Sequence, residues 1–174
     1  MDFTFTNKPE SKVDIPYFED VRAKETKYYS STKTVTQALK EVKAELLELG
    51  AYNISLAEGY FGVKPKRYGY LVTFGWNGAQ GKISLAGLPL KTEPYSSNQL
   101  QTKINKVRVQ ALLILRDQLI SYRQSPIFLV DTMPMMQHIL VDGKRTMFEY
   151  MAEFNNLPKA LSSGDIVEAE FVGE

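Results

Sequence analysis

Two amphipathic helical patterns, separated by three runs of alternating residues, constrain the fold of this chain more than any other feature. The patterns span residues 35–49 and 100–115, where apolar side chains recur at steps of three and four. Each helix therefore has one apolar stripe that must pack against another element. The second helix is expected to end near Tyr122, before Pro126. Capping-box spacing precedes both helices: Thr34 with Gln37, and Ser96 with Gln99.

The runs of alternating residues between the helical patterns predict a sheet. They span residues 52–57, 68–76 and 82–90. Asn77-Gly78 is a strong signal for a tight turn between the second and third runs, and Pro89 indicates that the third run ends there or lies at an edge. We therefore predict an α+β fold with an α-β-β-β-α core, in which a three-stranded antiparallel meander is covered on one face by two helices.

The remaining residues are less regular. We predict an extended N-terminal arm over residues 1–33, beginning with a short strand, the α-β-β-β-α core over residues 34–123, a C-terminal extension with a short helix over residues 124–161, and an acidic tail over residues 162–174. The tail is expected to be flexible or to form a late edge strand. The short helix follows a capping-box pair, Thr146 and Glu149. Its apolar residues are expected to face the core: Met147, Phe148, Tyr150, Met151 and Phe154.

Residue types exclude or disfavour several kinds of chemistry. The chain contains no cysteine, which excludes disulfides, thiolate metal sites and cysteine nucleophiles. His138 is the single histidine, and we expect it to pack beside Met136 and Leu140. Asp131 and Asp142 are candidates for a carboxylate site, although Asp142 beside Gly143 is also typical of a turn. We expect no cofactor, no metal site and no enzymatic activity.

Two further signals concern phosphate loops and membranes. Segment 75–84 contains glycines and the pair Gly81-Lys82. Five residues separate Gly75 from this pair, whereas a Walker A loop has four between its first glycine and the Gly-Lys pair, and here a strand follows instead of a helix. We expect a hairpin there. The longest dense apolar run, residues 111–115, is far shorter than the roughly 20 residues of a membrane span, and residues 1–12 lack the apolar stretch of a signal peptide. These features predict a cytoplasmic protein with no membrane partner.

Charge is distributed unevenly along the chain, although 21 bases and 20 acids give a net charge of only +1. Residues 1–33 carry six bases and six acids, residues 34–123 carry twelve bases and six acids, and residues 124–174 carry three bases and eight acids. The core therefore carries +6 and the C-terminal part −5. Such asymmetry is typical of a cationic binding face with an acidic competitor, or of self-association through complementary patches.

Basic and aromatic residues gather around the second strand and on the second helix, and they form the clearest functional pattern. In a nucleic-acid binder, cations neutralise phosphates and flat rings stack on bases, which contributes about 1–3 kcal/mol per base. The alternative is that the aromatic face is the core face of the sheet and the basic loop is a solvated turn. The candidate nucleic-acid-binding residues are Lys64, Lys66, Arg67, Tyr60, Phe61, Tyr68, Lys103 and Lys106.

The predicted order of elements over residues 34–123 resembles that of the double-stranded RNA-binding domain, including cations in the loop between the first two strands and on the second helix. Two features of that family differ here. Its second helix opens with a lysine cluster where this chain has Ser96-Ser97-Asn98-Gln99, and its Gly-Pro-x-His loop is replaced by Gly62-Val63-Lys64-Pro65. The β-β-β-α part is also similar to strand-annealing recombination proteins, which bind single strands in oligomeric rings. Topology alone does not establish function.

The pattern favours a non-enzymatic, nucleic-acid-associated protein that binds the phosphate backbone of single- or double-stranded nucleic acid through a basic, aromatic-rich loop and helix. The alternative is an oligomeric assembly or adaptor protein, of phage or mobile-element origin, that does not bind nucleic acid. In that case the arm and the acidic tail would pair with neighbouring subunits of a homo-oligomer. An enzyme acting through Asp131 and Asp142 is a third hypothesis.

Overall fold

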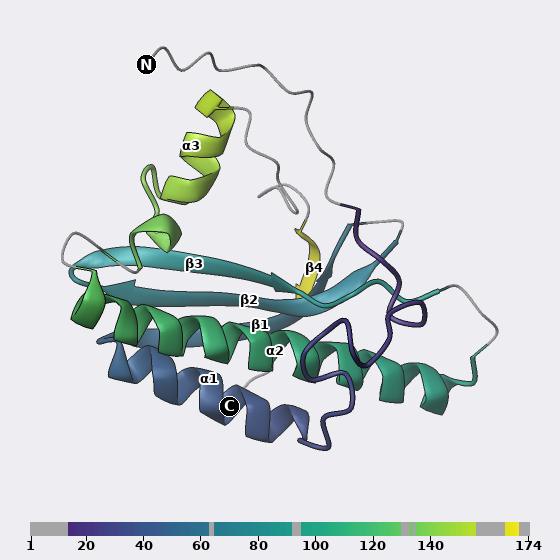
Figure 1. The fold of residues 1–174 in the computed structure, drawn as a ribbon. Helices are drawn as coiled ribbons and strands as arrows, with labels where there is room; N and C mark the ends of the chain where they lie inside the picture. The colour runs from purple at the N-terminus through teal and green to yellow at the C-terminus, as the bar shows by residue number, and fades with distance from the viewer. Residues whose placement is uncertain are drawn as a thin grey trace, which may run out of the picture.

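A computed structural model describes residues 14–62, 65–91, 95–129, 133, 135–155 and 166–170, with the side chains of residues 152–155 and 166–170 outside the description. Along the chain the elements follow the order helix, three strands, long helix, short helices and a last strand (Figure 1). Their bounds are α1 Val35–Glu48, β1 Tyr52–Phe61, β2 Arg67–Trp76, β3 Ala79–Ala86, α2 Ser97–Phe128, the 3-10 helix η1 Met136–His138, α3 Met147–Asn155 and β4 Ile166–Glu170.

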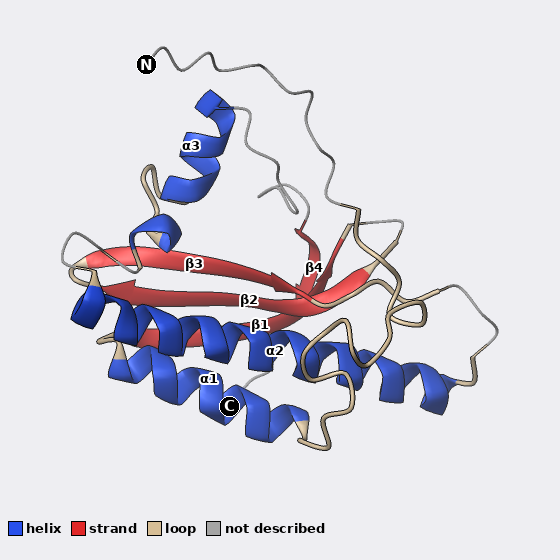
Figure 2. Cartoon of the chain, viewed as in Figure 1, coloured by secondary structure: helices blue, strands red, loops and turns tan. Residues whose placement is uncertain are grey.

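The sheet is antiparallel and has the strand order β3-β2-β1-β4. Helices α1 and α2 lie side by side on one face of it (Figure 2). The predicted α+β class, with a three-stranded meander covered by two helices, is confirmed. Residues 166–170 of the acidic tail form β4, which pairs with β1, so this part of the tail is the late edge strand.

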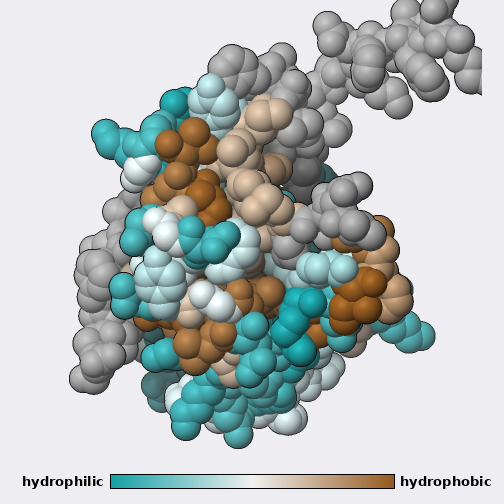
Figure 3. Space-filling view, turned by 90° about the vertical axis from the view of Figure 1, so that its left-hand side faces the viewer, coloured by the Kyte–Doolittle hydropathy of each residue, from teal (hydrophilic) through white to brown (hydrophobic). Residues whose placement is uncertain are grey.

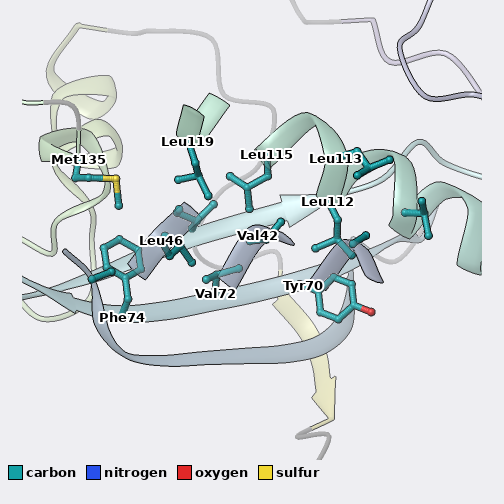
Figure 4. Packing of buried hydrophobic residues seen from close by; sticks show 14 residues of the cluster. Val42, Leu46, Tyr70, Val72, Phe74, Leu112, Leu113, Leu115, Leu119 and Met135 are labelled. Carbon is teal, nitrogen blue, oxygen red and sulfur yellow. The ribbon is translucent and has the colours of Figure 1, made fainter. Parts of the chain in front are cut away.

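The core lies between the two helices and the sheet face that they cover. Tyr70, Val72 and Phe74 of β2 are buried there beneath α2, and Leu46 of α1 packs with them (Figure 4). Leu56 of β1 belongs to the same face because it lies opposite Val72. The aromatic face of the second strand is therefore the core face of the sheet, as the alternative interpretation of the sequence held.

Local signals at the element ends form as predicted. The side chain of Thr34 accepts a hydrogen bond from the Gln37 amide, and the side chain of Gln37 accepts one from the Thr34 amide. Ser96 and Gln99 make the same reciprocal pair before α2. Asn77 and Gly78 have φ values of 52° and 81°, as a tight hairpin turn with two left-handed residues requires.

Helix α2 continues past Pro126 to Phe128, so the predicted end near Tyr122 is wrong. Proline removes one amide donor but leaves the following residues able to bond. The Leu129 amide donates to the Ser125 carbonyl at 2.8 Å, and the Ser125 hydroxyl donates to the Ser121 carbonyl at 2.7 Å. These bonds maintain the last turn around the proline.

The described part of the N-terminal arm, residues 14–33, packs along α2 without forming a helix or strand of its own. Phe18 is buried in a second apolar cluster with Leu90, Ile104 and Val107. Further along the arm, the Tyr28 hydroxyl donates to Asp117 on α2 at 2.7 Å. The arm is thus attached to the core by apolar and polar contacts.

The apolar residues of α3 that the structure describes are not buried as the sequence pattern predicted: Met147 and Tyr150 are half-buried, and the side chain of Phe154 lies outside the description. Phe148 and Met151 are exposed. Glu149 of α3 pairs with Lys82 of β3 at 3.3 Å, and the segment between α2 and α3 pairs with the same strand through Ile139 and Gly81. Met135, directly before η1, is buried in the core, whereas α3 lies on the side of β3 away from α1 and α2 (Figure 1).

His138 packs against α2 at the point where the extension returns to the core. Its ring centroid lies 5.8 Å from that of Tyr122, and its Nε2 lies 3.2 Å from the Tyr122 hydroxyl. Burial lowers the pKa of His138 to about 4. The imidazole is therefore neutral in the folded protein at neutral pH.

We predict that Gly69→Ala destabilises the protein strongly and that Gly75→Ala does so only weakly. A Cβ on Gly69 would lie 1.8 Å from the Leu85 carbonyl oxygen, which is backbone of the paired strand. A Cβ on Gly75 would meet the exposed Tyr52 ring at 2.3 Å, and this ring can move away. Urea unfolding should show a loss of about 3 kcal/mol or more for Gly69→Ala, and less than about 1 kcal/mol for Gly75→Ala. Equal losses would contradict the packing of β2 against β3.

We also predict that His138 makes the free energy of unfolding depend on pH. The unfolded chain, with an ordinary histidine pKa of about 6.5, binds the proton at higher pH than the folded protein does. The free energy of unfolding therefore falls as the pH drops from about 6.5 to about 4. Urea unfolding across this range should give a shallower dependence for His138→Gln than for the wild type. Carboxylates contribute equally to both proteins, so parallel curves would refute this role of His138.

Candidate functional site

Three of the sequence-predicted site residues meet at the hairpin between β1 and β2. The Nζ atom of Lys66 lies 4.2 Å from the ring centroid of Tyr60, and the rings of Tyr60 and Tyr68 lie edge to face at 6.2 Å. Lys66 is exposed, whereas both tyrosines are half-buried. Lys64 lies outside the described residues. The hairpin therefore presents one exposed cation beside an aromatic ring.

Arg67 and Phe61 have structural contacts instead. The Nε atom of Arg67 donates to the Gly87 carbonyl at 3.0 Å, and its Nη2 atom donates to the Ala86 carbonyl at 3.3 Å. Burial lowers the pKa of the Arg67 guanidinium. The Phe61 side chain is only 2% exposed. The hydrogen bonds direct Arg67 to the residues that follow β3. The burial of Phe61 leaves its ring no surface on which a base could stack.

Lys103 is held by the N-terminal arm. Its Nζ atom donates to Glu19 at 2.8 Å and to the Tyr95 hydroxyl at 2.6 Å. Burial alone would raise the pKa of Glu19, but the hydrogen bonds from Lys103 and from the Lys91 amide lower it. Lys103 therefore neutralises a carboxylate of its own chain, and it fixes the arm to α2.

Lys106 is exposed one turn further along α2 and lines a cleft of about 840 Å³, to which Lys103 does not contribute. We call this space the α1 cleft, because its walls are residues 29–36, which lead into α1, and the face of α2 that carries Thr102, Asn105, Lys106 and Val109. The structure therefore places Lys106 apart from the hairpin residues. The predicted set does not form a single surface.

The chemistry of the α1 cleft is unusually uniform. Its lining contains two lysines, Lys33 and Lys106, and no carboxylate. In an α-helix the first amides have no intrahelical acceptor, and Val35 and Thr36 of the first turn of α1 line the cleft. The first turn of α1 also contains no acidic residue. Tyr29 lines the cleft as well, and the serine and threonine hydroxyls come from Ser30, Ser31, Thr32, Thr34, Thr36 and Thr102.

A second cavity of about 470 Å³ adjoins residues 29–33 and shares them with the α1 cleft. Its lining includes Lys27, Lys33 and Arg116, and again no carboxylate. These three cations are paired with acids that do not line the cavity. Lys33 and Arg116 both contact Glu41, and Lys27 contacts Asp117 at 3.7 Å. Within the described residues, Lys106 is the cleft cation for which the structure records no ion pair.

The hydroxyl-rich segment was missed by reasoning from the sequence, although a signal was present. Residues 30–34 read Ser-Ser-Thr-Lys-Thr, and Thr34 is the first residue of the capping box of α1. This sequence places a run of hydroxyl donors at a helix N-terminus. Arg108 was also missed as a buried residue. It lies four residues after Ile104 and three before Ala111, on the apolar stripe of α2.

Arg108 forms a buried polar cluster between α2 and the sheet. It pairs with Glu58 of β1, and its guanidinium carbon lies 5.8 Å from the ring centroids of both Tyr68 and Tyr70. Burial raises the pKa of Tyr70 to about 12. The Arg108 Nε atom and the Tyr70 hydroxyl are buried without a hydrogen-bond partner. This cluster is part of the core and does not line either cavity.

The structure gives no support to a catalytic or metal-binding site built on Asp142. Asp142 is exposed and accepts hydrogen bonds from the amides of Lys144 and Arg145 and from the Arg145 side chain, and these bonds lower its pKa. That is the chemistry of a turn. Asp131 lies outside the described residues. Among the residues that the structure describes, no three histidine or acidic side chains are grouped as a metal site would require.

Within the described ranges, no helix combines the length and the apolar character needed to cross a membrane. No family model, curated protein or solved structure matches the chain.

Proposed function

We propose that the protein binds nucleic acid without altering it chemically, and that the α1 cleft holds its phosphates. The observation that carries this proposal is the lining of the cleft, which combines two lysines, six serine and threonine residues and the start of a helix with no carboxylate. Each of these groups donates hydrogen bonds to an anion or attracts it. A lining without carboxylates does not repel a phosphate.

The continuity of the two cavities favours a polymer over a small phosphate compound. Both border residues 29–33, and both lack carboxylates. A chain of phosphates could follow this track across the arm, whereas one small anion would need only part of it. Hydroxyls and lysines read the phosphate backbone and not the bases, so we expect little sequence preference.

The hairpin offers a second, smaller contact. Lys66 is exposed, and it lies over the half-buried ring of Tyr60. This hairpin is at the end of the sheet where α2 begins (Figure 1). With a single exposed cation in the described part of the hairpin, its contribution should be weaker than that of the α1 cleft.

We predict that Lys106→Glu weakens binding of a fluorescently labelled single-stranded oligonucleotide at least about 10-fold at 50 mM salt, and lowers the salt dependence by about one phosphate contact. The physical reason is that the variant replaces Lys106, the cleft lysine for which the structure records no ion pair, by a carboxylate. Fluorescence anisotropy at 50 mM and 200 mM salt measures both effects. Oligonucleotides of different sequence should lose affinity alike.

Lys144→Glu is the matched control, because Lys144 is exposed in the turn before α3 and lines neither cavity. It makes the same charge change and should leave the affinity within about 2-fold of the wild type. If Lys66→Glu weakens binding more than Lys106→Glu does, the main contact is the hairpin and not the cleft. A wild-type protein that binds no oligonucleotide at 50 mM salt disproves the proposed function.

A further inference from the structure

Apolar side chains are exposed where α2 ends. Ile127 is 75% exposed, Phe128 81% and Leu129 56%. Met133 and Met136, which follow in the chain, are also exposed, as are Phe148 and Met151 of α3. We call these seven residues the α2-end patch. Figure 3 faces the side of the molecule on which α2 ends and shows several groups of apolar residues there, with polar residues between them.

Helix α2 is longer than any strand that it covers. A helix of 32 residues is about 48 Å long, whereas a strand of 10 residues such as β2 spans about 33 Å. Leu119 is the last α2 residue in the buried core cluster. Tyr122 is the last α2 residue that packs against this cluster, so Ile127 and Phe128 come after the part of the helix that contacts the core.

The size of the patch matches a protein interface. At about 150–200 Å² of accessible surface for a large apolar residue, the exposed fractions of the seven residues amount to roughly 600–800 Å². A stable dimer buries about 800 Å² on each partner, and a monomer rarely exposes apolar patches of more than a few hundred Å².

The charge of the patch favours a second copy of this chain as the partner. Among the described residues from Gln124 to Val141, none carries a charge at neutral pH, because His138 is neutral there. Glu149, which lies between Phe148 and Met151 of α3, is paired with Lys82 at 3.3 Å, so the described part of the patch brings no unpaired charge to a second copy. From these observations we infer that two copies associate through the α2-end patch in a closed two-fold dimer, with each α2 end packed on the other copy.

Sedimentation velocity of the full chain, without nucleic acid, tests this inference. The wild type should sediment as a dimer in the range of about 1–100 µM, where an interface of this size associates. Phe128→Asp places a carboxylate at the centre of the patch, and it should weaken dimerisation at least about 30-fold. Circular dichroism confirms that the variant is folded.

Ile114→Asp is the matched control. Ile114 is 46% exposed on the same helix, about four turns before Phe128 and outside the patch. This variant should dimerise as the wild type does. A wild type that is monomeric at about 100 µM, or an oligomer that Phe128→Asp leaves intact, overturns the inference. Because no nucleic acid is present, this outcome is independent of the proposed function.

Discussion

The burial of one face of α2 against β2 and β3 is the interaction on which the rest of the molecule depends. Leu112, Leu115 and Leu119 of α2 are buried in the same cluster as Tyr70 and Val72 of β2, and each buried leucine contributes about 1.5–3 kcal/mol. Once this stripe is fixed on the sheet, the position of every other α2 residue follows from the helical period. Thr102 and Lys106 then form a wall of the α1 cleft, and Ile127 and Phe128 are exposed at the end of the helix.

The buried stripe also contains a charge, which gives the packing a specific register. Arg108 is buried among apolar neighbours and pairs with Glu58 of β1, next to the rings of Tyr68 and Tyr70. A buried charge without its partner is strongly unfavourable, so shifts of α2 that separate Arg108 from Glu58 are disfavoured. Apolar contacts alone would tolerate such shifts more readily, since they have no direction. The ion pair therefore helps to fix where the α1 cleft forms.

Features with local causes could be predicted from the sequence, and those that depend on distant partners could not. Thr34 and Gln37 are three residues apart and bond to each other, so their spacing suffices to predict the start of α1. Lys103 meets Glu19 from 84 residues away, and nothing in the spacing of either residue indicates the other. The helical period gives the face on which a lysine lies, but not the acid that another segment brings to it. For this reason the two helices, the meander and its turn were predicted, whereas the grouping of the basic residues was not.

The same ion pairs change the meaning of the positive charge of the core. Two acids of the N-terminal arm pair with lysines of the core: Asp20 pairs with Lys91, and Glu19 pairs with Lys103. What remains for a phosphate in the α1 cleft is Lys106 and a set of neutral donors, which makes a single cleft a weak site at physiological salt. A two-fold dimer would carry two such clefts on one particle, and linking two weak sites raises the overall affinity by about 10²–10⁴-fold when both reach the same polymer. Dimerisation through the apolar end of α2 would then compensate for the weak affinity of a single cleft, because it supplies a second cleft without any further cation in the first.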